Sequence, residues 1–140
     1  MLRLSGNLLS TLRTLLFVKA YPGTTHTFRM SSTTALKEYL CIVPDKKDTL
    51  AGRMKVRPIH VEKVSSLVEQ KIVTFAGGFA DEHPAEGEIP GFLGSCVVIR
   101  AESKDKVWEI LKSDIYTETG VWDIENAQVH AMLTAFRAAK

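Results

Sequence analysis

Short apolar runs alternate with amphipathic segments over residues 36–133 of this 140-residue chain. Four runs of apolar and β-forming residues predict strands, at 39–43, 72–76, 94–101 and 121–132. Helical spacing of apolar residues from Pro58 to Gln70 predicts one helix, and Ser103 is a good N-cap for a second. The order β-α-β-β-α-β predicts an α+β, ferredoxin-like fold, in which an antiparallel sheet carries two helices on one face.

The connections follow from glycine, proline and charge. Residues 46–55 are polar and predict a linker before the first helix, and Gly77-Gly78 predicts the end of the second strand. Residues 79–92 form a long acidic loop, which is interpreted as a lid or as a floppy insertion.

Two of the predicted strands avoid water on both faces. Consecutive residues are apolar in Leu40–Val43 and in Val97–Ile99, whereas a half-buried strand alternates apolar and polar positions. Two helices cover only one face of a sheet. An exposed apolar sheet face usually marks an interface, so the sequence predicts a homodimer that packs sheet against sheet.

Composition restricts the classes of partner. Hydrophobic residues make up 45% of the chain and charged residues 24%, which is typical of a globular domain. From Glu38 onward the charge balance is slightly acidic, so no nucleic-acid partner is predicted. No apolar run reaches the roughly 20 residues that span a bilayer, and no membrane association of the mature form is predicted. Cys41 and Cys96 lie in apolar runs without metal-site spacing; neither a metal nor an organic cofactor is expected.

The N-terminal residues 1–31 differ from the rest of the chain. They contain no acid, and their leucines recur at helical spacing beside Arg3 and Arg13. This composition is typical of a mitochondrial transit peptide, with the matrix as destination. A disordered leader on a cytoplasmic protein and a secretory signal are the alternatives. Residues 134–140 form a basic C-terminal tail.

Two residues are candidates for acid–base chemistry. His60 shares a helical face with Val64 and Leu67 and is predicted to point toward the sheet, near the start of its helix, as a general base or as a core histidine. Asp114 is expected to end the second helix, where the macrodipole disfavours a carboxylate. His60, a backbone N–H or solvent would compensate. If the two side chains meet, the carboxylate fixes the imidazole tautomer.

Three further residues are candidates for ligand contact. Arg57 could hold an anionic or phenolate substrate or form a surface salt bridge. Ser95 shares a strand face with Val97 and could donate to a ligand or simply fill the strand. Tyr116 could line a pocket for a flat molecule or belong to the core.

An ordered set of short motifs resembles the YciI-like (YCII-related) family over about residues 38–132. The set comprises RMKVRPIH at 53–60, GG at 77–78, GFLGS at 91–95, SDIY at 113–116 and GVW at 120–122. The resemblance implies a dimeric α/β-barrel fold. In one bacterial branch, which removes chloride from a chlorinated hydroxyhydroquinone, a His and an Asp are proposed to act together; the matching residues are His60 and Asp114. Family members usually have Asp-Pro where this chain has Asp114-Ile115, which puts the geometry of that turn in doubt.

Two hypotheses about function follow. The first is a cofactor-independent enzyme of the isomerase, lyase or dehydrohalogenase type, which uses His60 and Asp114 on a small cyclic or aromatic substrate. The second is a non-catalytic dimeric module for ligand binding or interaction. Fold analogy alone does not choose between them.

Overall fold

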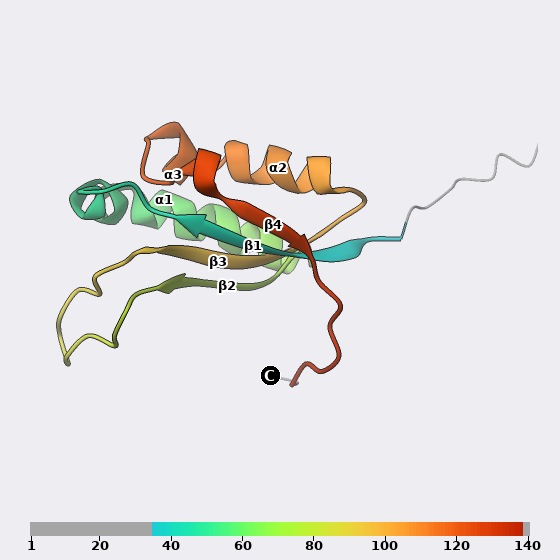
Figure 1. Cartoon of the computed structure of the whole chain (residues 1–140), viewed down its shortest axis with the longest axis horizontal. Helices are drawn as coiled ribbons and strands as arrows, with labels where there is room; N and C mark the ends of the chain where they lie inside the picture. Colours follow the sequence, from blue (N-terminus) through green and yellow to red (C-terminus); the bar gives the residue numbers. More distant parts are fainter. Residues whose placement is uncertain (1–34, 139–140) are drawn as a thin grey trace, which may run out of the picture. The chain divides into compact units, whose positions relative to one another are not determined.

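Four antiparallel strands form one sheet in the computed structural model, which describes residues 35–138 (Figure 1). The strands are β1 (Lys37–Pro44), β2 (Val73–Phe79), β3 (Gly94–Ala101) and β4 (Gln128–Ala131). Their spatial order is β2-β3-β1-β4, and every neighbouring pair is antiparallel. The predicted ferredoxin-like arrangement is confirmed. The transit peptide predicted for residues 1–31 lies outside the described residues.

The helices lie together on one face of the sheet (Figure 1). They are α1 (Leu50–Glu69), α2 (Lys104–Lys112) and the short α3 (Ile115–Glu118), followed by a 3₁₀ turn, η1 (Ile124–Asn126). The core between the two layers includes Cys41, Val43 and Ile99 from the sheet and Val107 and Leu111 from α2. Within residues 35–138, no helix is both long and apolar enough to cross a bilayer.

The first helix begins at Leu50, eight residues before the predicted start at Pro58. Its first turns bury Arg53 instead of an apolar residue, so the segment looks like a polar linker in the sequence. Pro58 lies inside the helix, where its missing N–H leaves the carbonyl of Met54 without a helical donor. His60 is therefore in the middle of α1, and the prediction that it lies near the start of its helix is wrong.

Strand β2 continues through Gly77-Gly78 to Phe79, so the prediction that the two glycines end this strand is wrong. At Gly78 the absence of a side chain is required by a close approach. A Cβ atom there would lie 2.5 Å from Cε1 of Phe92 and 3.2 Å from Nη2 of Arg53. The last strand is also shorter than predicted, because residues 121–127 form an isolated bridge from Trp122 to Asp45 and then η1.

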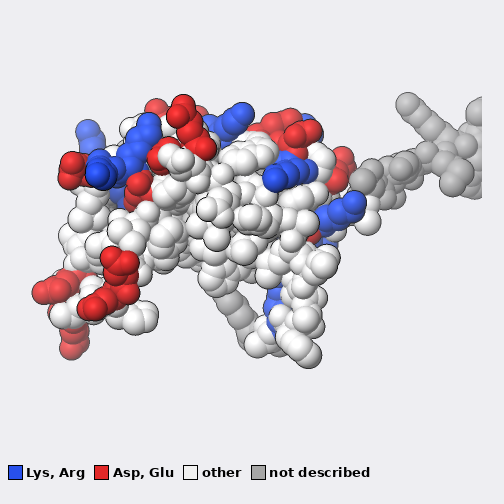
Figure 2. Space-filling model, viewed as in Figure 1, with Lys and Arg blue, Asp and Glu red and all other residues white. Residues whose placement is uncertain are grey.

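The acidic loop joins β2 to β3 and carries a cluster of acidic side chains at its tip (Figure 2). Its base is held by the N–H of Leu93, which donates to the carbonyl of Phe79 at 2.9 Å. The N–H of Asp45 in turn donates to the carbonyl of Leu93 at 2.8 Å. These bonds fix the end of the loop that carries Phe92, while the tip extends away from the sheet (Figure 1).

Candidate active site

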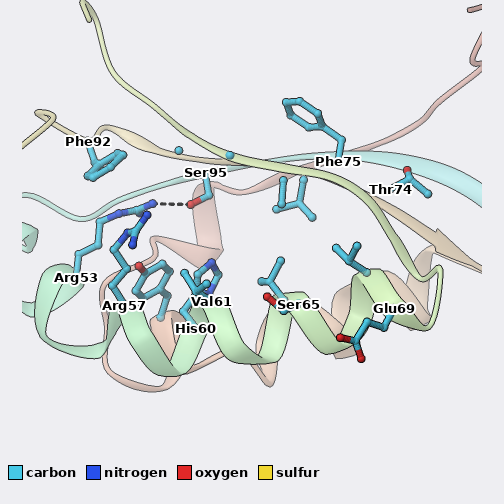
Figure 3. A pocket seen from close by; sticks show the side chains of 17 residues that line it. Arg53, Arg57, His60, Val61, Ser65, Glu69, Thr74, Phe75, Phe92 and Ser95 are labelled. Atoms are coloured by element: carbon cyan, nitrogen blue, oxygen red, sulfur yellow. Dashed lines mark hydrogen bonds between the residues drawn. The ribbon is translucent and has the colours of Figure 1, made fainter. Parts of the chain in front are cut away.

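A cavity of about 500 Å³ lies between α1 and the sheet edge formed by β2 and β3 (Figure 3). One end is polar and aromatic, and the side chains there come from four different parts of the chain. They are Arg53, Arg57 and His60 of α1, Phe92 of the β2–β3 loop, Ser95 of β3 and Tyr116 of α3. The convergence of several charged and polar groups in one cavity makes this end the candidate active site.

The imidazole of His60 meets the carboxylate of Asp114 at the wall of the cavity. His60 Nδ1 lies 2.8 Å from Asp114 Oδ1, and the two side chains are only 12% and 7% exposed. An ionised carboxylate only accepts hydrogen bonds, so Nδ1 is the nitrogen that carries the proton. In the neutral ring, Nε2 then keeps its lone pair and is able to accept a proton.

The sequence indicated that Asp114 ends the second helix, and this prediction is wrong. Helix α2 finishes at Lys112, and Asp114 is the N-cap of α3. Its Oδ1 accepts a second hydrogen bond, at 2.9 Å, from the backbone N–H of Tyr116. The carboxylate therefore lies at the favourable end of a helical turn. Ile115 occupies the first helical position, which also suits proline, so Asp114-Ile115 can adopt the turn expected of Asp-Pro.

Aromatic rings fix the plane of His60. Tyr116 stacks on the imidazole with 4.0 Å between centroids and 19° between planes, and Trp122 meets its edge at 5.5 Å. Burial raises the pKa of the Tyr116 phenol above its ordinary value, although Arg53 and Arg57 oppose this effect. Tyr116 is therefore neutral at physiological pH.

Arg53 organises the back of the site. Its Nη1 donates to both carboxylate oxygens of Asp45 at 2.8 Å, and its Nη2 donates to Ser95 Oγ at 2.9 Å. The guanidinium carbon lies 4.5 Å from the ring centroid of Phe92 and 4.7 Å from that of Tyr116. Burial raises the pKa of Asp45, and the charge of Arg53 lowers it in part. The positive charge of Arg53 is thus largely balanced by Asp45 within the protein.

Ser95 accepts a second hydrogen bond, at 3.3 Å, from Trp122 Nε1. A serine hydroxyl has two acceptor positions and one donor. With both acceptor positions occupied, the O–H is left to donate, and Ser95 lines the cavity. This geometry suits a ligand contact and does not suit a nucleophile.

The predicted site residues lie together. His60, Ser95 and Tyr116 line the cavity, and Asp114 is bonded to His60 behind it. Arg57 is exposed at the cavity and forms no ion pair with any carboxylate in residues 35–138. Over the same range, no group of three or more His, Cys, Asp or Glu side chains is arranged to hold a metal ion.

Sequence reasoning missed Arg53, Asp45 and Phe92 as parts of the site. A signal was present, because Arg53, Arg57 and His60 follow one another at i, i+4 and i+7. That spacing was not used, since the helix was predicted to begin only at Pro58.

Comparison with known proteins gives the class of the chain. The model of the YCII-related domain matches residues 38–129, and the chain therefore belongs to the YCII-related domain family. It is 41% identical over 90 residues to fusaric acid biosynthesis protein 2 of Gibberella fujikuroi, a match that covers 64% of this chain and 86% of that protein. It is 36% identical over 105 residues to aspercryptin biosynthesis cluster protein B of Emericella nidulans, covering 74% and 67%.

A solved structure shares the fold. It is 5-chloro-2-hydroxyhydroquinone dehydrochlorinase from Burkholderia phenoliruptrix AC1100, in complex with 2,5-dihydroxybenzoquinone. The TM-score is 0.59 at 19% identity, over 69% of this chain and 93% of that one. At this level of identity the likeness confirms the fold class, and it leaves the reaction of this chain to be argued from its own residues.

Proposed function

We propose that this chain is a cofactor-independent enzyme that performs acid–base chemistry on a small cyclic or aromatic molecule. The observation that supports the proposal most is the 2.8 Å contact between His60 Nδ1 and Asp114 Oδ1 at a cavity wall. A histidine whose Nδ1 proton is held by a carboxylate presents a basic Nε2. Two relatives are named for the biosynthesis of fusaric acid and of aspercryptin, and a protein of the same fold is a dehydrochlorinase. These names support a reaction on small molecules.

The proposed mechanism assigns one role to each residue. Nε2 of His60 removes a proton from an activated C–H or O–H group, and Asp114 holds the ring in the required tautomer and stabilises the imidazolium that forms. Arg57 binds the negative charge of an enolate or phenolate, and the Ser95 O–H donates to a substrate oxygen. The ring of Tyr116 lies behind His60 and limits the movement of the imidazole. Isomerisation, elimination and loss of a halide through an enolate or phenolate all begin with such a proton transfer.

Solvent hydrogen exchange tests this proposal without knowledge of the natural substrate. The probe is 2,5-dihydroxybenzoquinone in D₂O, whose ring C–H groups exchange through a keto tautomer. Because general base catalysis contributes about 10²–10⁴-fold, the wild-type chain is expected to accelerate loss of the ring proton signal in NMR by that factor over buffer. If the quinone binds but its ring protons exchange no faster than in buffer, the proposal of an enzyme is contradicted and the non-catalytic binding module is favoured.

We also propose that the chain forms a homodimer through the sheet face that the helices leave open. Leu40, Cys96 and Val98 line a groove on this face together with the C-terminal segment 132–138. In that segment Leu133 and Phe136 are 94% and 96% exposed, an arrangement that favours a covering partner. Sedimentation velocity at micromolar concentration is expected to give a dimer. A clean monomer would refute the proposal.

The targeting prediction for residues 1–31 is likewise a proposal. An acid-free segment with arginines suits import into the mitochondrial matrix. A fluorescent fusion of the full chain is expected to enter mitochondria, and deletion of the first 30 residues is expected to abolish import. Unchanged import after deletion would remove the idea.

A further inference from the structure

The cavity continues well beyond the catalytic end. It follows α1 from Arg53 to Glu69, and the polar end and the far end differ in chemistry (Figure 3). His60 and Val68 are eight residues apart, which corresponds to about 12 Å along a helix. A single aromatic ring beside His60 would leave most of this length unoccupied.

The middle of the cavity is mostly apolar, although Ser65 and Thr74 also line it. Val61, Val64 and Val68 line it from α1, and Val97 lines it from β3. Val61 and Val68 are 41% and 49% exposed, so the fold leaves these side chains open to water although they face the same cavity as His60. Phe75 also lines the cavity, although its ring lies on the other side of β2 from α1 (Figure 3).

The space exists because β2 presents very small residues opposite the valines. Ala76 and Gly78 line the cavity on the side of α1 and offer only one methyl group between them, whereas a Cβ atom at Gly77 would lie on the side of Phe75. A strand of this fold with ordinary β-branched residues would fill the gap to α1. Close to the candidate base, Phe92 and Arg53 occupy the room above Gly78, whereas the part next to Ala76 is empty.

Charge gives the cavity a direction. Arg57 lies at the catalytic end without an ion-pair partner in residues 35–138, and Glu69 lies at the opposite end. An anionic group is attracted to the first end and repelled from the second. A ligand with an acidic head therefore enters with its head at His60 and its apolar part along the valines.

The geometry points to an amphipathic substrate class: a ring with an anionic or phenolic head beside Arg57 and His60, carrying an alkyl chain that lies along Val61, Val64 and Val68. This inference rests on the proposed function, because it places the reacting head at the proposed base. It goes further in assigning a chain-binding channel, which an unsubstituted ring would not use.

Binding of 4-alkylbenzoates, from benzoate to 4-butylbenzoate, tests the channel by calorimetry. Since each buried methylene contributes about 0.8 kcal/mol, or about three- to fourfold in affinity, the Kd is expected to fall by about 30-fold or more from the methyl to the butyl compound. Arg57→Gln is expected to weaken every compound by a similar factor and to keep the dependence on chain length.

Val68→Asp is expected to flatten the dependence on chain length, because a charge replaces an apolar wall. Ile59→Asp is the matched control, since Ile59 is an exposed apolar residue of the same helix that does not line the cavity. It should keep the wild-type dependence. Affinity that does not change with chain length, an equal loss of chain dependence in both variants, or no binding of any benzoate would overturn the inference.

The quinone exchange assay separates the two proposals. 2,5-Dihydroxybenzoquinone has no alkyl chain. Catalysed exchange, together with benzoate affinities that do not depend on chain length, would therefore contradict only the inferred chain-binding channel. Benzoate affinities that rise with chain length, without catalysed exchange of the quinone, would support the channel and contradict the proposal of an enzyme.

Discussion

Substitution of His60 by alanine is expected to lower the catalysed exchange of 2,5-dihydroxybenzoquinone by about 10²–10⁴-fold, to the rate in buffer. The physical reason is that the ring is the group at the cavity wall that pairs a basic nitrogen with a carboxylate. His60→Gln tests the same point with a side chain that still fills part of the space and still bonds to Asp114. NMR in D₂O with the purified chain provides the rates.

The control for His60 is His130→Ala. His130 is exposed on β4, its Nε2 lies 3.1 Å from Gln128 Oε1, and it does not line the cavity. This variant should retain the wild-type rate. Asp114→Asn should lose about 10²-fold or more, because an amide can donate to Nδ1 and favour the other tautomer. Equal rates in wild type and His60→Ala would contradict the role of the base.

Replacement of Arg53 by methionine is expected to lower the free energy of unfolding by about 3–5 kcal/mol. Arg53 and Asp45 form an ion pair with both side chains buried, and Arg53 also supports Ser95 and lies between the rings of Phe92 and Tyr116. Removal of the cation leaves the Asp45 carboxylate buried without its partner. Urea unfolding at neutral pH measures the loss.

The loss in Arg53→Met should depend on pH in a defined direction. Burial already raises the folded-state pKa of Asp45, and loss of Arg53 removes a charge that lowers it. A carboxyl whose pKa is raised on folding costs stability when ionised, and this cost disappears as the pH falls through the raised pKa. The variant should thus be closest to wild type in mild acid. Arg57→Met, at an exposed position one turn later, should change stability by less than about 0.5 kcal/mol. Equal losses in the two variants would contradict the account.

The strands of the core could be predicted because buried strands are composed of apolar residues, which are visible in the sequence. β3 was predicted with its observed bounds, Gly94–Ala101, since the consecutive residues Val97–Ile99 are apolar on both faces. The start of α1 could not be predicted, because its first turns bury an arginine whose ion pair with Asp45 is a tertiary contact. The continuation of β2 through Gly77-Gly78 was missed for a similar reason. Gly78 accommodates Phe92 and Arg53, and the sequence alone does not indicate that approach.

The candidate site was predictable in its residues but less so in its geometry. Helical spacing placed His60 toward the sheet, and the motif resemblance paired it with Asp114. The reason expected for Asp114 was wrong, because it caps α3 and does not end α2. Arg53 was not singled out, since a buried arginine is recognised only through the partners that surround it: Asp45, Ser95 and two aromatic rings.

The tautomer of His60 tests the central claim most directly. ¹⁵N chemical shifts of the imidazole, recorded at a pH where the ring is neutral, report which nitrogen carries the proton. We predict a protonated Nδ1, held by Asp114, and an unprotonated Nε2 that shifts when 2,5-dihydroxybenzoquinone binds. A ring protonated at Nε2, or one whose Nε2 does not respond to the quinone, would contradict the claim that this nitrogen is the base.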